Sequence, residues 1–203
     1  MTDSGREPRS SSSVPAPETG GVQGAGRISG RRNWSRLGTF VVIILAAAVI
    51  QRYGFNISAV RGVSMEPTLH EGQRLFVNKT AAWTGSFSRG DVVVLKEPDG
   101  TGMEKTHPYL VKRIVAAAGD RIEITDGRVF VNGEELKEPY TDERIEDGDY
   151  GPFTVGKGYC FVMGDNRRGG ASLDSRSFGP IAVRSLVGRA EWIVWPPEAL
   201  KGL

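Results

Sequence analysis

The stretch "RIEITDGRVFVNGEEL", residues 121–136, decides the fold class of this chain of 203 residues. On each side of Asp126-Gly127, apolar Ile or Val side chains alternate with polar ones. Alternation with period two is typical of a strand that buries one face, and an Asp-Gly pair between two such runs is typical of a two-residue β-hairpin turn. The stretch therefore predicts a β-hairpin.

Short runs of the same character extend from residue 56 to the end of the chain. They are rich in Val, Ile and aromatic residues, are separated by Gly, Pro and Asp, and read "RLFVNK", "DVVVLK", "YLVKRIVAAA", "GYCFVMGD" and "AEWIVW". Few long helical periods interrupt them. We therefore expect a mainly β domain over residues 56–203, built from two antiparallel sheets, with residues 120–155 as an inserted cap or second sheet.

The composition makes several classes of function unlikely for the domain. The net charge is +2, with acidic and basic residues intermixed, so no nucleic-acid partner is expected. The single cysteine, Cys160, excludes an intramolecular disulfide, and two histidines leave little from which to build a metal site. Cys160 lies in the apolar run "YCFVM", which is typical of a small buried side chain.

The N-terminal third of the chain has a different character. Residues 1–33 are dominated by Ser, Gly, Pro, Thr and Arg, and we expect them to be disordered. The following run "LGTFVVIILAAAVIQ", residues 37–51, is uncharged, strongly apolar and flanked by arginines. A membrane-spanning helix needs about 20 residues, so a span over residues 34–55 would use Trp34, Tyr53 and Phe55 as interfacial anchors.

A cleavable signal peptide is the alternative for this run, because its apolar region has the right length and ends in small residues. The polar leader of residues 1–33 is long for a signal peptide, which favours an uncleaved single-pass anchor in the lipid bilayer. By the positive-inside rule, the basic leader would lie in the cytoplasm and the domain after residue 55 would lie outside.

A serine in the stretch "GVSMEPTLHEG", residues 62–72, raises the question of catalysis. Ser64 could be a turn residue or a nucleophile, and a serine nucleophile needs a neighbouring base. His70 and His107 lie in polar loop sequences, which indicates solvated side chains. Pro67 occupies the position where penicillin-binding proteins carry their lysine. The commoner serine-based arrangements therefore fit poorly.

Lys112 is the one lysine of seven that lies inside an apolar strand sequence. In "YLVKRIVAAA" its neighbours on the same face are Leu110 and Ile114, so its amine would be partly desolvated. Burial lowers the pKa of a lysine and makes it a usable general base. Alternatively, Lys112 and Arg113 are surface charges that protect an edge strand from aggregation. The residues alone favour neither interpretation.

A polar cluster follows in "MGDNRRGGASLDSRSFGP", residues 163–180. It contains Asp165, Asn166, Arg167, Ser172, Asp174, Ser175 and Arg176. Polar groups at this density either face water or satisfy one another in a network. A solvated loop is one interpretation. A network beside Lys112 is the other, and it would supply a hydroxyl to orient the amine and an Asp/Arg pair to fix that hydroxyl.

Four motifs in this order resemble the bacterial type I signal peptidases, which are membrane-anchored serine endopeptidases with a Ser/Lys dyad. They are "SMEPTL" at 64–69, "GDVVVL" at 90–95, "KRIVAAAGD" at 112–120, and "GDNR" with "SLDSRSFGP" at 164–180. The resemblance extends from residue 56 to the end of the chain. It implies the β fold shared by signal peptidases and self-cleaving repressors, after one N-terminal transmembrane helix.

The resemblance also assigns the central roles. It implies that Ser64 is the nucleophile and that Lys112 is the general base, oriented by Ser172. Asp174 and Arg176 would brace the loop of Ser172 as a charge pair. Two further residues would support this loop, namely Asp165 and Arg167.

The substrate would bind as an extended strand. The Ser64 backbone N–H would donate to the oxyanion, and Met65 and Leu110 would line the pocket for alanine of an Ala-x-Ala site. Two positions depart from the common pattern. Gly62 stands where some members carry a serine as second oxyanion donor, and the loop 168–171 makes the spacing to Ser172 two residues longer than usual.

These features predict an enzyme that removes signal peptides from secretory precursors on the extracytoplasmic side of the cell membrane, without metal or cofactor. A self-cleaving repressor would need an N-terminal DNA-binding domain, which residues 1–33 cannot form. A non-catalytic β-module with a polar binding loop, tethered to or secreted across the membrane, is the alternative from another class.

Overall fold

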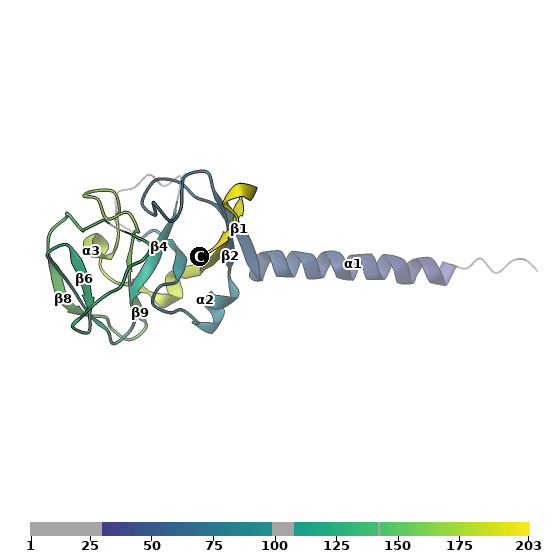
Figure 1. Ribbon diagram of the computed structural model, residues 1–203. Helices are drawn as coiled ribbons and strands as arrows, with labels where there is room; N and C mark the ends of the chain where they lie inside the picture. The colour runs from purple at the N-terminus through teal and green to yellow at the C-terminus, as the bar shows by residue number, and fades with distance from the viewer. Residues whose placement is uncertain (1–29, 99–107, 142) are drawn as a thin grey trace, which may run out of the picture. The chain divides into compact units, whose positions relative to one another are not determined.

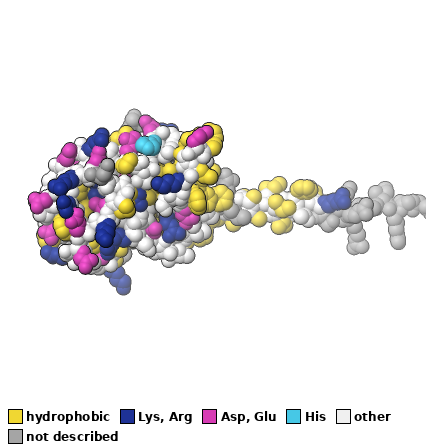
Figure 2. Space-filling model, in the orientation of Figure 1, with side chains coloured by type: hydrophobic (Ala, Val, Ile, Leu, Met, Phe, Trp, Pro, Cys, Tyr) yellow, Lys and Arg dark blue, Asp and Glu magenta, His cyan; other side chains and the backbone are white. Residues whose placement is uncertain are grey.

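The computed structural model describes residues 30–98, 108–141 and 143–203, with helix side chains from residue 36 to 49 and at Tyr53. The expected disordered leader up to residue 29 and His107 lie outside these ranges. Two antiparallel sheets make up the β part, as predicted (Figure 1). Acidic and basic side chains are intermixed over the face of this part that Figure 2 shows.

Helix α1 spans Gly30–Tyr53, so it begins before the predicted residue 34, and the expectation of disorder is wrong for residues 30–33. It ends before Phe55, the first residue of strand β1. Its described apolar side chains are exposed, and Phe40 and Ile44 each expose 65% of their surface. Within the part of the chain that the structure describes, no helix combines the length and apolarity needed to cross a membrane.

The larger sheet has the order β1-β2-β11-β3-β4-β9-β10, and β12 also pairs with β11. Its strands are β1 (Phe55–Ala59), β2 (Arg74–Asn78), β3 (Val92–Lys96), β4 (Tyr109–Ala116), β9 (Tyr159–Met163), β10 (Ile181–Ala182), β11 (Leu186–Trp195) and β12 (Lys201–Gly202). Strand β3, with the sequence "VVVLK", is buried on both faces. Val92 and Val94 belong to one apolar cluster, while Val93 and Leu95 belong to another.

The smaller sheet has the order β7-β6-β5-β8 and lies in the chain between β4 and β9, as predicted for residues 120–155. Its strands are β5 (Arg121–Thr125), β6 (Arg128–Val131), β7 (Glu134–Glu135) and β8 (Tyr150–Thr154). The predicted hairpin is confirmed, since β5 and β6 pair antiparallel and Asp126 and Gly127 have φ of 53° and 74°. Positive φ at both turn residues is the type I′ geometry.

The apolar face of the smaller sheet packs against the larger sheet. Ile122 and Ile124 from β5 share one cluster with Phe161 and Met163 from β9, and all four side chains are fully buried. The short helices are α2 (Thr80–Thr84), α3 (Ser175–Phe178), η1 (Val183–Ser185) and η2 (Pro197–Ala199). This packing brings the connections of the smaller sheet close to the polar loop after β9.

Two glycines of the smaller sheet allow a test of this packing. Gly127 and Gly133 both occupy the second position of a hairpin turn with positive φ, at 74° and 85°. A Cβ at Gly127 would lie 2.9 Å from the Ile145 carbonyl oxygen, whereas one at Gly133 would meet nothing within 4 Å. Gly133→Ala should cost about 1 kcal/mol from the backbone alone, and Gly127→Ala about 2 kcal/mol or more. Urea unfolding measures both values, and equal losses would contradict the close packing of Ile145 on the turn.

Candidate active site

Ser64 lies in the connection between β1 and β2, and the polar loop after β9 holds its backbone. The Asn166 side chain donates to the Val63 carbonyl oxygen over 3.1 Å, and the Asn166 backbone N–H donates to the Ser64 carbonyl oxygen over 3.1 Å. Two hydrogen bonds from one residue fix the peptide units on either side of the Ser64 Cα. The loop after β9 therefore sets the position of the serine.

Lys112 lies on β4, and its side chain points into the protein towards Ser64. The residue is only 2% exposed, and its Nζ donates to Ser64 Oγ over 2.7 Å. Arg113 is also buried. The interpretation of these two residues as surface charges on an edge strand is therefore wrong.

The burial of Lys112 changes its acidity. Desolvation lowers the pKa of the Lys112 amine from 10.5 to about 8, and the positive charge of Arg176 acts in the same direction. The carboxylates of Asp174 and Asp165 oppose this shift. A buried amine with this pKa is partly neutral near neutral pH, and a neutral amine 2.7 Å from a hydroxyl can accept its proton.

Ser172, Asp174 and Arg176 form one hydrogen-bonded unit. Ser172 Oγ donates to Asp174 Oδ2 over 2.9 Å, and Arg176 donates to both oxygens of Asp174 through Nε and Nη2, each over 2.9 Å. Asp174 also caps helix α3. Among the described residues Ser172 makes no hydrogen bond to Lys112. Its hydroxyl donates instead to Asp174, whose negative charge acts on the Lys112 amine.

Gly164 allows this unit to approach the serine. A Cβ at Gly164 would overlap both the Ser64 carbonyl oxygen and Ser172 Oγ. The Gly164 N–H donates to Asp174 Oδ2 over 3.4 Å. The Ser172 hydroxyl and the Ser64 backbone therefore lie against the same glycine, and no larger residue fits between them.

Asp165 and Arg167 are buried and take partners from outside the loop. Asp165 accepts two hydrogen bonds from Arg113, over 2.9 and 2.6 Å, and Arg167 donates two to Glu138. The Arg113 guanidinium also stacks on the ring of Tyr140, 4.0 Å from its centroid. Arg113 and Glu138 were not predicted as members of the site. Arg113 could have been found, because an arginine inside an apolar strand sequence requires a carboxylate partner.

A cavity of about 350 Å³ lies beside Ser64 and contains both predicted pocket residues, Met65 and Leu110, in its wall. Its sides are residues 57–62 and residues 108–111. Gly62, also in the wall, donates its N–H to Glu71 Oε1 over 3.4 Å. No partner for the Ser64 N–H is found among residues 30–98, 108–141 and 143–203, so this donor remains available.

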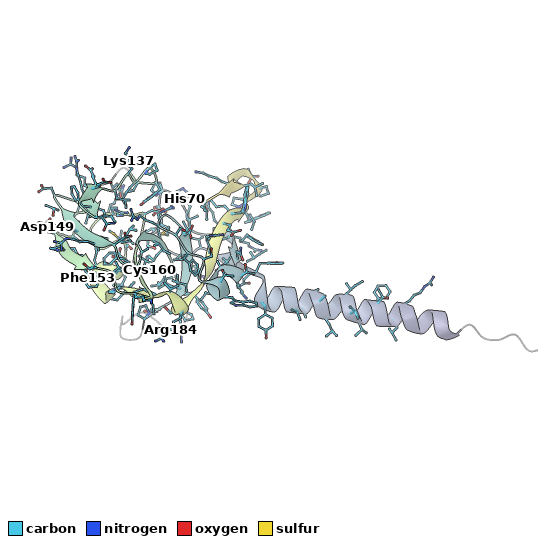
Figure 3. The ribbon with its side chains drawn as sticks, turned by 90° about the horizontal axis from the view of Figure 1, so that it is seen from below. His70, Lys137, Asp149, Phe153, Cys160 and Arg184 are labelled. Carbon is cyan, nitrogen blue, oxygen red and sulfur yellow. The ribbon has the colours of Figure 1, made fainter. Side chains whose placement is uncertain are left out.

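The described histidine and cysteine lie apart from this arrangement. Figure 3 labels His70 and Cys160. His70 is exposed and its Nδ1 lies 3.6 Å from Glu66 Oε1, whereas Cys160 is buried in the sheet and burial raises the pKa of its thiol to about 12. No group of three or more His, Cys, Asp and Glu side chains within the described ranges could hold a metal ion. Ser64 and Lys112 are thus the candidate pair that the structure brings within hydrogen-bond distance.

Comparison with known proteins places this arrangement in a family. The signal peptidase family, peptidase S26, matches residues 31–195. Signal peptidase I P of Bacillus subtilis subsp. natto is 39% identical over 166 residues, which cover 77% of this chain and 85% of that protein. Signal peptidase I of Bacillus licheniformis is 37% identical over the same shares of both chains. Signal peptidase I T of Bacillus subtilis strain 168 is 37% identical, covering 77% of this chain and 82% of that protein. The chain therefore belongs to the signal peptidase family of serine proteases, peptidase S26.

Proposed function

We propose that this enzyme removes signal peptides from secretory precursors by a Ser/Lys mechanism that passes through an acyl-enzyme. One observation carries the proposal, namely the distance of 2.7 Å between Lys112 Nζ and Ser64 Oγ inside a buried site. Membership of the signal peptidase family supplies the reaction class. The low pKa of Lys112 supplies a base that can be neutral at the pH of a cell exterior.

In the first half of the reaction, neutral Lys112 takes the proton of Ser64 as Oγ attacks the scissile carbonyl. The tetrahedral intermediate collapses, the peptide bond breaks, and Lys112 gives the proton to the leaving amine. In the second half, Lys112 takes a proton from water, and the water oxygen attacks the Ser64 ester. The second tetrahedral intermediate collapses and Lys112 returns its proton to Ser64 Oγ. The products are the cleaved signal peptide, the mature protein and the free Ser64 hydroxyl.

The surrounding groups stabilise the charges that form in these steps. The anion of Asp174 favours the lysine cation that appears when Ser64 is deprotonated. The N–H of Ser64 is the oxyanion donor, and such a donor contributes about 3 kcal/mol to acyl transfer. Gly62 can add only a backbone N–H, and that group already has Glu71 as a partner.

The precursor would bind as an added strand in the cavity beside Ser64. The first half of β4 pairs with β3 from residue 109 onward, but β9 pairs with β4 only from Arg113. Among the described residues, the second edge of residues 109–112 has no strand partner, and an extended peptide could hydrogen-bond to it. Met65 and Leu110 restrict the pocket, which favours alanine at an Ala-x-Ala site.

Helix α1 would anchor the enzyme in the lipid bilayer as a single pass only together with interfacial contacts of Trp34 and Tyr53, because its apolar run alone does not have the length and apolarity of a membrane span. Its apolar run of residues 37–51 exposes large side chains, among them Leu37, Ile43 and Leu45 with 57–65% of their surface exposed. The arginines before the run favour a cytoplasmic N-terminus, which places the catalytic unit on the extracytoplasmic side.

The Ser/Lys pair is tested with a precursor peptide whose signal ends in Ala-x-Ala, in detergent. Ser64→Ala and Lys112→Met should each lower kcat/KM by about a thousandfold or more, since each removes one member of the proton-transfer pair. The wild-type kcat/KM should rise about tenfold between pH 7 and pH 9, because Lys112 loses its proton near pH 8.

Exposed Lys137 provides a matched control, as Lys137→Met should leave the rate unchanged. Retained activity in Lys112→Met would assign the base to another residue, and a wild type that cannot cleave would favour a binding module.

Charge changes around Lys112 should move the acid limb of the pH profile in opposite directions. Asp174→Asn removes an anion that raises the pKa of Lys112, so the limb should move to lower pH while the maximal rate falls. Arg176→Gln removes a cation that lowers this pKa, so the limb should move to higher pH. The measurement is kcat/KM from pH 5 to 10 for both variants, after circular dichroism has shown that each is folded. Shifts in the same direction would contradict the assignment of the limb to Lys112.

The anchor is tested by extraction of the expressed chain from membranes with alkaline carbonate. The wild type should stay in the membrane pellet. Replacing both Val42 and Ile44 by Asp places two charges near the middle of the run, each costing about 3 kcal/mol in a bilayer, and should shift the chain to the supernatant. The control is the double variant Glu134→Asp and Glu135→Asp, which changes two exposed residues of β7 without changing the net charge. It should remain in the pellet. Extraction of the wild type itself would exclude the anchor.

A further inference from the structure

The loop that lengthens the spacing to Ser172 lies against an acidic segment just before β8. The loop comprises residues 168–171 and the acidic segment comprises residues 143–147. Arg168 Nε donates to Glu143 Oε1 over 2.6 Å, and the Gly169 N–H donates to Glu146 Oε2 over 3.3 Å. The segment 143–147, which connects strands β7 and β8 of the smaller sheet, thus holds the loop 168–171 by hydrogen bonds.

Asp147 differs from the other acidic residues of this segment, because it contacts both the longer loop and helix α3. Its Oδ1 accepts the Gly170 N–H over 3.1 Å, and its Oδ2 accepts Arg176 Nη1 over 3.0 Å. Arg176 is 9% exposed in its side chain, so this ion pair is largely shielded on the arginine side.

The geometry of the guanidinium explains why a second carboxylate matters. Arg176 uses Nε and Nη2 for Asp174, which leaves Nη1 for Asp147. Two carboxylates on two edges of a planar group fix both its position and its orientation. Asp174, which receives the Ser172 hydroxyl, is held in place by this same guanidinium.

The glycines of the loop explain why it needs a tether. Gly170 has φ of 72°, a conformation that glycine adopts readily, and a Cβ at Gly169 would lie 3.2 Å from Asp147 Oδ1. Glycine therefore permits the close approach of Asp147, but it also gives the free loop a large conformational entropy. The contact with Asp147 restricts the two residues that precede Ala171 and Ser172.

We propose that Asp147 is a positioning residue for catalysis, which fixes Arg176 and the longer loop and thereby holds Asp174 and Ser172 beside Lys112. This inference rests on the proposed Ser/Lys function. Asp147 is not among the residues that line the cavity beside Ser64, so its effect should appear in the chemical step and not in substrate binding.

The test compares Asp147→Asn with Glu143→Gln in cleavage of the precursor peptide. Asparagine keeps an acceptor for the Gly170 N–H but removes the charge that holds Arg176. We expect kcat to fall about three- to tenfold with KM unchanged. Glu143→Gln breaks an ion pair of the same segment whose partner Arg168 is 71% exposed, and it should leave both constants unchanged. Asp147→Glu, which restores the charge, should recover part of the lost rate.

A double variant separates positioning from a general loss of stability. In an Arg176→Lys background the Nη1 contact is already absent, so adding Asp147→Asn should lower kcat by less than twofold. Amide hydrogen exchange gives a readout that does not need activity. Asp147→Ala removes the acceptor of the Gly170 N–H, so this amide should exchange faster in Asp147→Ala than in Glu143→Gln.

Several outcomes would overturn the proposal. They are an Asp147→Asn enzyme as fast as the wild type, a rise in KM without loss of kcat, equal effects in both arginine backgrounds, or unchanged amide exchange at Gly170 in Asp147→Ala. A wild type that does not cleave the precursor would refute the proposed function and with it the catalytic role of Asp147. The exchange measurement would then still decide whether Asp147 holds the loop.

Discussion

The contact between the Lys112 amine and the Ser64 hydroxyl is the interaction on which the rest of this site depends. An ammonium group loses hydration free energy when it is buried, and the protein lowers this cost by allowing the amine to release its proton near pH 8. Lys112 pairs with Val93 of strand β3, and only 2% of the residue is exposed. A more exposed lysine would keep its proton, and a more deeply isolated one would have no hydroxyl to act on.

Buried arginine–carboxylate pairs hold the walls of this site together. Arg113 with Asp165 joins β4 to the polar loop, and Arg167 with Glu138 joins this loop to the connection after β7. Removing one member of a buried pair leaves an uncompensated charge, which costs more than the loss of a surface ion pair. The polar loop is therefore fixed to the larger sheet and to the connections of the smaller one, so the inserted region contributes to the geometry of the site.

Much of the β architecture could be predicted from the sequence, because period-two alternation and the Asp126-Gly127 turn are local signals. The burial of Lys112 was one of two open interpretations, since a charged residue in a strand has no local mark that tells a core face from an edge. Glu138 and Asp147 could not be predicted as partners, because tertiary packing determines which acidic residue reaches which arginine. Tertiary packing also determines the partner of Ser172. Its hydroxyl donates to Asp174, whereas an interaction with Lys112 was expected.

A direct titration of Lys112 tests the central claim more closely than any rate measurement. The Cε resonance of Lys112 in protein labelled with ¹³C, assigned by its absence in Lys112→Met, can be followed by NMR from pH 6 to 11. The account predicts a midpoint near pH 8, as expected for a desolvated amine beside Ser64. A midpoint at the ordinary lysine value of 10.5 would show that the amine stays protonated at neutral pH, and would contradict its role as the general base.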